Sequence, residues 1–155
     1  MTATNRALTP VVGVVAMLAV TVVVAGVAGV ALLDDAAPDR PAPTVALSLS
    51  ATPDRVSITH RGGDALDVSS LRVRVSVDGT RLAEQPPVPF FAAAGFEPGP
   101  TGPFNAAADQ TWTAGETATF AVAATNRPSV DAGATLSVTI YRKDTPVAEL
   151  STTVG

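Results

Sequence analysis

The pattern of hydrophobic residues divides the chain into one long apolar run and a longer stretch in which apolar and polar positions alternate. The run extends from Val11 to Leu33 and contains no charged residue. As a helix with a rise of ~1.5 Å per residue it would be roughly 35 Å long, and the hydrocarbon core of a bilayer is about 30 Å thick. The run therefore predicts one transmembrane α-helix.

Charged residues flank this run unequally. Arg6 precedes it, whereas Asp34 and Asp35 follow it directly. Positive charge is favoured on the cytoplasmic side of a membrane helix. We therefore expect a single-pass protein of the cell membrane, in contact with membrane lipid, with a short cytoplasmic N-terminus and an extracellular C-terminal domain.

The residues after the run predict a spacer and a β domain. Residues 34–44 read DDAAPDRPAPT, and their prolines are typical of a semi-rigid linker. Over residues 45–155, apolar residues recur at alternate positions, as in half-buried strands. Short strands are expected at residues 45–49, 56–59, 71–77, 80–83, 118–122, 136–140 and 147–154. The predicted fold class is a mainly β head, an antiparallel, immunoglobulin-like sandwich, with one long N-terminal transmembrane α-helix. The sequence does not predict the order of the strands in this sandwich.

One glycine pair lies between two of the expected strands, in the segment HRGGDAL that begins at His60. We interpret the segment as a structural turn formed by His60, Gly62, Gly63 and Asp64. Gly62 and Gly63 can adopt positive φ, and Asp64 can accept hydrogen bonds from exposed backbone N–H groups. The alternative is a cation site at Asp64 and Asp67, but a calcium loop needs more closely spaced oxygen ligands.

The stretch from Gln85 to Gln110 breaks the strand pattern, and we call it the aromatic loop. It is rich in proline and contains most of the phenylalanines of the chain. Two interpretations are open, because the rings could be buried where the loop folds over an edge of the sandwich, or some could stay exposed and bind a neighbouring subunit or another surface. The candidate interaction residues are Phe90, Phe91, Phe96, Phe104 and Trp112.

Composition and charge exclude several kinds of chemistry. The chain has 10 Lys and Arg against 14 Asp and Glu, so it offers no basic surface for nucleic acid. It has no cysteine and one histidine, His60, which excludes disulfides, thiol nucleophiles and the common zinc sites within the chain. A catalytic triad would need His60, yet no Gly-x-Ser-x-Gly pattern accompanies it. We expect no enzyme activity, cofactor or metal ion.

The residues at the start of the apolar run, RALTPVVG from Arg6, resemble the N-terminal segment of archaeal type IV pilins and archaellin-like proteins, the haloarchaeal pilin N-terminal domain family. In that family a basic and a small residue precede a cleavage site. The resemblance implies that a prepilin peptidase cleaves between Ala7 and Leu8, leaving residues 1–7 as leader and 8–33 as helix. Thr9 stands where the family usually has serine, and Val12 where bacterial pilins have glutamate. An uncleaved membrane anchor is the alternative.

The turn that begins at His60 is similar to one in archaeal pilin-like extracellular domains. Together the two resemblances imply a pilin-like structural subunit that assembles through its N-terminal helix into a surface filament or pseudopilus. The implied partners are prepilin peptidase, a pilus assembly ATPase with its membrane platform, and other pilin subunits. From a different functional class, the alternative is a membrane-anchored extracellular binding or accessory domain that never polymerises.

Overall fold

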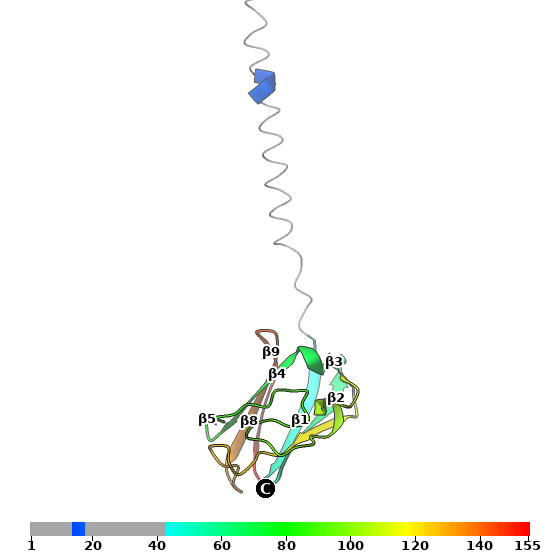
Figure 1. Cartoon of the computed structure of the whole chain (residues 1–155). Coiled ribbons are helices and arrows are strands. Elements are labelled where there is room, and N and C mark those ends of the chain that lie inside the picture. The colour runs from blue at the N-terminus through cyan, green and yellow to red at the C-terminus, as the bar shows by residue number, and fades with distance from the viewer. Residues whose placement is uncertain (1–13, 18–42) are drawn as a thin grey trace, which may run out of the picture. The chain divides into compact units, whose positions relative to one another are not determined.

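The computed structural model describes residues 14–17 and 43–155 (Figure 1). Residues 14–17 are helical. In these described parts, no helix is long and apolar enough to cross a membrane. The predicted leader and the Ala7–Leu8 cleavage site lie outside the described residues, as do most of helix 8–33 and of spacer 34–44. Contacts divide the chain into two units, Met1–Pro41 and Ala42–Gly155, and we call the described part of the second unit the head.

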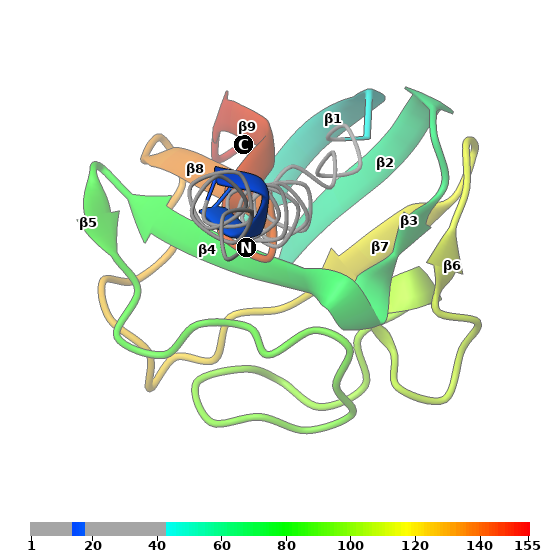
Figure 2. The ribbon, with the colours of Figure 1, turned by 90° about the horizontal axis from the view of Figure 1, so that it is seen from above.

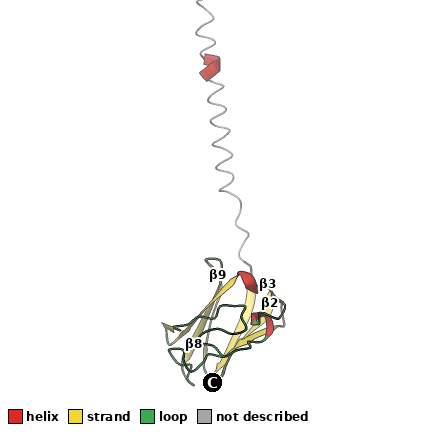
Figure 3. Ribbon diagram, viewed as in Figure 1, coloured by secondary structure: helices red, strands yellow, loops and turns green. Residues whose placement is uncertain are grey.

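The head is a mainly β domain in which all paired strands are antiparallel, and this part of the predicted fold is confirmed (Figures 1 and 3). One sheet has the order β1-β2-β7, a second has the order β5-β4-β8-β9, and β3 pairs with β6. The strands are β1 Val45–Thr52, β2 Arg55–Gly63, β3 Leu66–Asp67, β4 Leu71–Val77, β5 Thr80–Arg81, β6 Thr111–Trp112, β7 Thr117–Phe120, β8 Thr135–Arg142 and β9 Thr145–Thr153. Two short 3-10 helices are η1 Val68–Ser70 and η2 Gly102–Phe104.

Alternate residues of the strands form the apolar core. In β4, Val73 and Val75 are buried, whereas Arg72 on the opposite face is exposed. Val138 of β8 pairs with Val75 and is fully buried on the same face. The alternation seen in the sequence therefore identifies the inner face of this sheet, where a buried aliphatic side chain contributes about 1.5 to 3 kcal/mol.

A two-residue hairpin turn joins β4 to β5, as the sequence predicts. Asp78 and Gly79 have φ values of 48° and 77°, the left-handed conformation that a type I′ turn requires at both positions. The Asp78 carboxylate also accepts a hydrogen bond from the Thr135 backbone N–H at 2.8 Å. The turn thus connects β4 to the start of β8.

The reversal predicted to begin at His60 lies farther along the chain. His60, Gly62 and Gly63 belong to strand β2, which pairs with β1 up to Gly63 through one irregularity in register. The chain turns at Asp64, whose carboxylate accepts the Thr44 backbone N–H at 2.9 Å. Only Gly63 of the glycine pair has positive φ, and a Cβ there would lie 2.2 Å from Thr44 O. Pairing with the long strand β1 extends β2 beyond what local turn propensity indicates.

Candidate functional site

The aromatic loop is anchored to the sheet by one glutamine side chain. The Gln85 amide oxygen accepts the Val75 backbone N–H at 2.7 Å, and its Nε2 donates to Val75 O at 3.0 Å and to Leu82 O at 2.8 Å. The side chain therefore takes the place of a strand neighbour beside β4. This arrangement satisfies backbone groups of β4 after the two-residue strand β5 has ended.

Farther along, the aromatic loop covers the free edge of β7. Thr101 and Thr119 exchange backbone hydrogen bonds of 3.0 and 3.1 Å, and their hydroxyl groups are also hydrogen-bonded. The Glu97 N–H donates to Ala121 O at 3.0 Å, beyond the end of the strand. Because an exposed sheet edge is a template for unwanted pairing, this cover protects the β1-β2-β7 sheet. Figure 2 shows the loop along the side of the head away from β1 and β9.

Four of the five candidate aromatic residues are part of the core. Phe104 and Trp112 are fully buried, with ring centroids 5.3 Å apart in an edge-to-face arrangement. Phe90 and Phe96 are 5% exposed and lie 5.7 Å apart. Phe120 of β7 contacts both groups, at 5.8 Å from Phe96 and 6.2 Å from Phe104. These four residues therefore hold the loop on the sheet and are not available to a partner.

Phe91 is the remaining candidate interaction residue, and its side chain is 63% exposed. The backbone beneath it is well ordered by hydrogen bonds, since Phe91 O accepts the Gly99 N–H at 2.7 Å. The adjacent Phe90 donates to Phe104 O at 2.9 Å and accepts from Ala106 at 3.1 Å. The hypothesis of an aromatic contact surface therefore narrows to Phe91.

A buried asparagine fixes the start of the aromatic loop and a point near its middle. Asn126 is 2% exposed, and its Nδ2 donates to Glu84 O at 2.9 Å and to Gly95 O at 3.2 Å. Its Oδ1 accepts the backbone N–H groups of Glu84 and Arg127, both at 3.0 Å. Sequence analysis missed this residue, because the segment after β7 has no hydrophobic periodicity that would mark a polar side chain as buried.

Replacing Asn126 with alanine is expected to destabilise the head by about 2 kcal/mol, because it leaves backbone donors and acceptors without partners. Urea unfolding would measure the loss. Asn105→Ala is the matched control, since Asn105 is less buried and its side chain makes two hydrogen bonds, to Pro100 O and from Ala107 N. A larger loss at Asn105 than at Asn126 would contradict the role given to Asn126.

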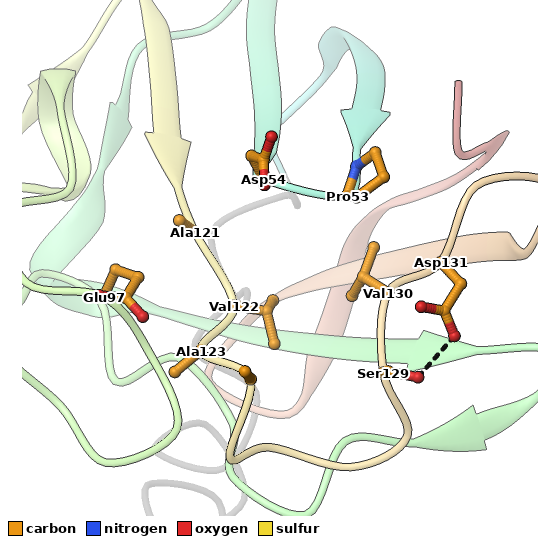
Figure 4. Close-up of a pocket in the computed structure, with 10 residues that line it drawn as sticks. Pro53, Asp54, Glu97, Ala121, Val122, Ala123, Ser129, Val130 and Asp131 are labelled. Carbon is orange, nitrogen blue, oxygen red and sulfur yellow. Dashed lines mark hydrogen bonds between the residues drawn. The ribbon is translucent and has the colours of Figure 1, made fainter.

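A pocket of about 440 Å³ lies at the end of the head where the β1–β2 hairpin turns (Figure 4). Asp54, Glu97 and Asp131 line it on three sides of the view, and Val122 and Val130 contribute apolar side chains. Sequence analysis did not single out these residues, because they come from separate turns that only the fold brings together. The pocket combines negative charge with a partly apolar lining.

The pocket contains no pair of residues arranged as a nucleophile and base. The Ser129 hydroxyl donates to the Asp131 carboxylate at 2.6 Å, an arrangement within one turn. Across residues 43–155 and 14–17, no group of three His, Cys, Asp or Glu side chains is placed to hold a metal ion. Outside the pocket, Asp109 accepts the Thr111 N–H at 2.8 Å, and hydrogen bonds from Thr111 lower the pKa of this exposed carboxyl group.

His60 lies in the core beside the aromatic residues. It is fully buried, its ring centroid is 5.9 Å from that of Trp112, and Nε2 is 2.9 Å from Asp64 O. Its Nδ1 has no hydrogen-bond partner. The His60 side chain thus contacts an indole ring and a backbone carbonyl, and these contacts position the end of β2 against the aromatic core.

Comparison with known proteins gives no assignment, since no family model and no curated protein matches the chain. The resemblance to archaeal pilins therefore rests on the residues RALTPVVG from Arg6 and on the segment that begins at His60.

Proposed function

We propose that the protein is a type IV pilin-like structural subunit. One observation carries the proposal: Arg6 and Ala7 stand three residues before an uncharged apolar run long enough to span a membrane, and a proline-rich spacer and a β domain follow. A secretory signal peptide has a shorter apolar core of about 7 to 15 residues. The length of the run supports retention of the helix in the mature protein.

In the proposed pathway, prepilin peptidase removes residues 1–7 at the cytoplasmic face of the membrane. Helix 8–33 then holds the subunit in lipid until an assembly ATPase and its membrane platform transfer the helix into the core of a filament or pseudopilus. Pro10 would lie in the first turn of the proposed helix, where its missing N–H would remove no intrahelical hydrogen bond. The head is displayed outside the cell.

We further infer that the head is an immunoglobulin-like sandwich. The order β1-β2-β7 corresponds to strands A, B and E of that fold, and β5-β4-β8-β9 corresponds to C′, C, F and G. The aromatic loop follows β5 and borders β7, so it takes the place of a further strand beside E. Strand order and the shared apolar core both support this assignment.

Processing provides the direct test of the proposed function. The membrane-bound protein from the native cells is expected to begin at Leu8, and Ala7→Trp is expected to block cleavage because a small residue precedes the cut. Ala3→Trp makes the same change outside the cleavage site and should leave processing intact. Mass spectrometry of the mature N-terminus measures both results.

A protein that keeps residues 1–7 and forms no multimer would overturn the proposal. That result would support the non-polymerising membrane-anchored binding domain. Equal cleavage of the Ala7→Trp and Ala3→Trp proteins would show that the peptidase does not require a small residue at position 7.

A further inference from the structure

The pocket of Figure 4 contains carboxylates that the fold leaves without partners. Asp54 comes from the β1–β2 turn and Glu97 from the aromatic loop, and both residues are exposed. Within the described part of the chain, neither carboxylate accepts a hydrogen bond or forms an ion pair. Asp131, the third carboxylate, accepts the Ser129 hydroxyl at 2.6 Å. The pocket therefore holds negative charge that no ion pair within the described head neutralises.

The backbone of Val122 adds a second kind of polar group to the pocket. Ala121 O accepts a hydrogen bond from the aromatic loop and Ala123 N donates one to it, each at 3.0 Å. Since the hydrogen-bonding groups of a strand alternate between its two sides, the N–H and C=O of Val122 point the other way, toward the β1–β2 turn. Neither group has a hydrogen-bond partner among the described residues. The pocket thus offers an unpaired carbonyl acceptor together with its carboxylates.

These groups define the chemistry of a ligand. Val122 and Val130 supply apolar surface, and the acceptors lie around it. In the described ranges no three acidic side chains are close enough to hold a metal ion. A lysine side chain meets both requirements, because its ammonium group has three donors and no acceptor and its four-carbon stem packs on apolar surface. The pocket therefore fits a lysine side chain better than a bare cation.

The chain has a single lysine, Lys143, and it lies at the tip of the β8–β9 hairpin. Lys143 and Asp144 form the two-residue turn between the paired residues Arg142 and Thr145, and Lys143 is exposed. Arg72 binds the Asp144 carboxylate and Lys143 O, both at 2.8 Å. Across residues 14–17 and 43–155, the Lys143 ammonium group forms no ion pair or hydrogen bond. The hairpin thus presents an unpaired cation on an anchored backbone.

Strand β9 separates Lys143 from the pocket of the same head. The strand begins at Thr145, beside the hairpin tip, and after its end Gly155 N donates to Ala51 O, close to the β1–β2 turn. Its 9 residues span roughly 30 Å at ~3.3 Å each. Figure 1 shows the β8–β9 hairpin and the C-terminus at opposite ends of the head. Lys143 can therefore enter such a pocket only in another molecule.

We propose that Lys143 of one copy inserts into the pocket of a second copy of this chain. Its ammonium group binds the carboxylates of Asp54 and Glu97 and the carbonyl oxygen of Val122, and its stem packs against Val122 and Val130. Charge complementarity supports this occupant. The head has eight Arg and Lys against eleven Asp and Glu, so two copies repel on average, and a contact between them needs opposite charges where they touch.

A contact between two different surfaces of the same molecule is heterologous, and it continues from head to head unless a ring closes. The inference rests on the proposed function, because membrane insertion followed by assembly would bring many heads together in one orientation. It adds to that function by naming the surfaces through which the heads meet and the charges that set their register.

Zero-length cross-linking of the full chain in native membranes or filaments tests the contact. A water-soluble carbodiimide joins an amine to a carboxylate that already touches it. Treatment is expected to give covalent multimers in which mass spectrometry finds Lys143 joined to Asp54, Glu97 or Asp131. Within one head these residues lie at opposite ends, so each such bond joins two molecules. Lys143→Arg keeps the charge but removes the reactive amine, and it should assemble normally and lose every one of these bonds.

Charge reversal separates a specific contact from chance proximity. Glu97→Arg is expected to abolish the multimers linked through Lys143. Glu149→Arg is the matched control, because it makes the same change at an exposed residue of β9 outside the pocket, and it should leave them unchanged. Combining Lys143→Glu with Glu97→Lys should restore multimers in which residues 97 and 143 are still joined. Unchanged urea unfolding transitions would show that the variants are folded.

Equal losses in the Glu97→Arg and Glu149→Arg proteins, or multimers joined through Lys143 only to carboxylates outside the pocket, would overturn the contact. Bonds from the pocket carboxylates to the amines of another protein would identify a different occupant and reject Lys143. Filaments that form without any bond at the pocket would overturn the contact but not the proposed function. The expected bonds in protein that retains residues 1–7 would support the contact and contradict only the proposed function.

Discussion

Phe104→Ala is expected to destabilise the head by about 3 to 5 kcal/mol, the range measured for removal of large aromatic side chains from protein cores. Phe104 is fully buried, and its ring lies 5.3 Å from Trp112 and 6.2 Å from Phe120. Its removal takes away the ring that joins the aromatic loop to both β6 and β7. Since most domains are stable by only about 5 to 15 kcal/mol, the loss would be a large part of the total.

Urea unfolding measured by circular dichroism, together with the fluorescence of the single tryptophan, Trp112, would determine the loss. Phe91→Ala is the matched control, because it makes the same change in the same loop at a side chain that is 63% exposed. It should alter the free energy of unfolding by no more than about 0.5 kcal/mol. Similar losses in the two variants would contradict the assignment of Phe104 to the core.

Gly102→Ala is expected to destabilise the head by about 2 to 5 kcal/mol, combining the penalty for positive φ with that of overpacking. Gly102 has a φ of +65°, and a Cβ there would lie 2.2 Å from the carbonyl oxygen of Thr117. That oxygen belongs to the backbone of β7, so the aromatic loop would have to move away from the strand. The hydrogen bonds between Thr101 and Thr119 would be lost with it.

Gly99→Ala separates the two contributions. Gly99 has a φ of +79°, but nothing lies within 4 Å of the position that its Cβ would occupy. Its replacement should therefore bring only the conformational penalty of about 1 to 2 kcal/mol. Thermal unfolding of both variants would test the comparison, and a loss at Gly99 equal to that at Gly102 would show that close approach to β7 is unimportant.

Two kinds of local signal were sufficient to predict much of the β head. The alternation over Leu71–Val77 predicts strand β4 because side chains of a strand point to opposite faces in turn. Asp78 and Gly79 predict the hairpin turn because few residues accept the left-handed conformation. The two-residue strands β3 and β6 were not predicted, since they are too short to show an alternation.

The sequence by itself determined the apolar run, the absence of thiol chemistry and the strands with alternating residues. It left open which phenylalanines of the aromatic loop are buried, because a phenylalanine side chain is equally hydrophobic whether its ring is buried or exposed. Only the tertiary structure distinguished Phe91 from Phe104, and it did so through contacts with β6 and β7 that are distant in the sequence. Burial of Asn126 and Phe104 depends on which surfaces meet in space, which local residue patterns do not encode.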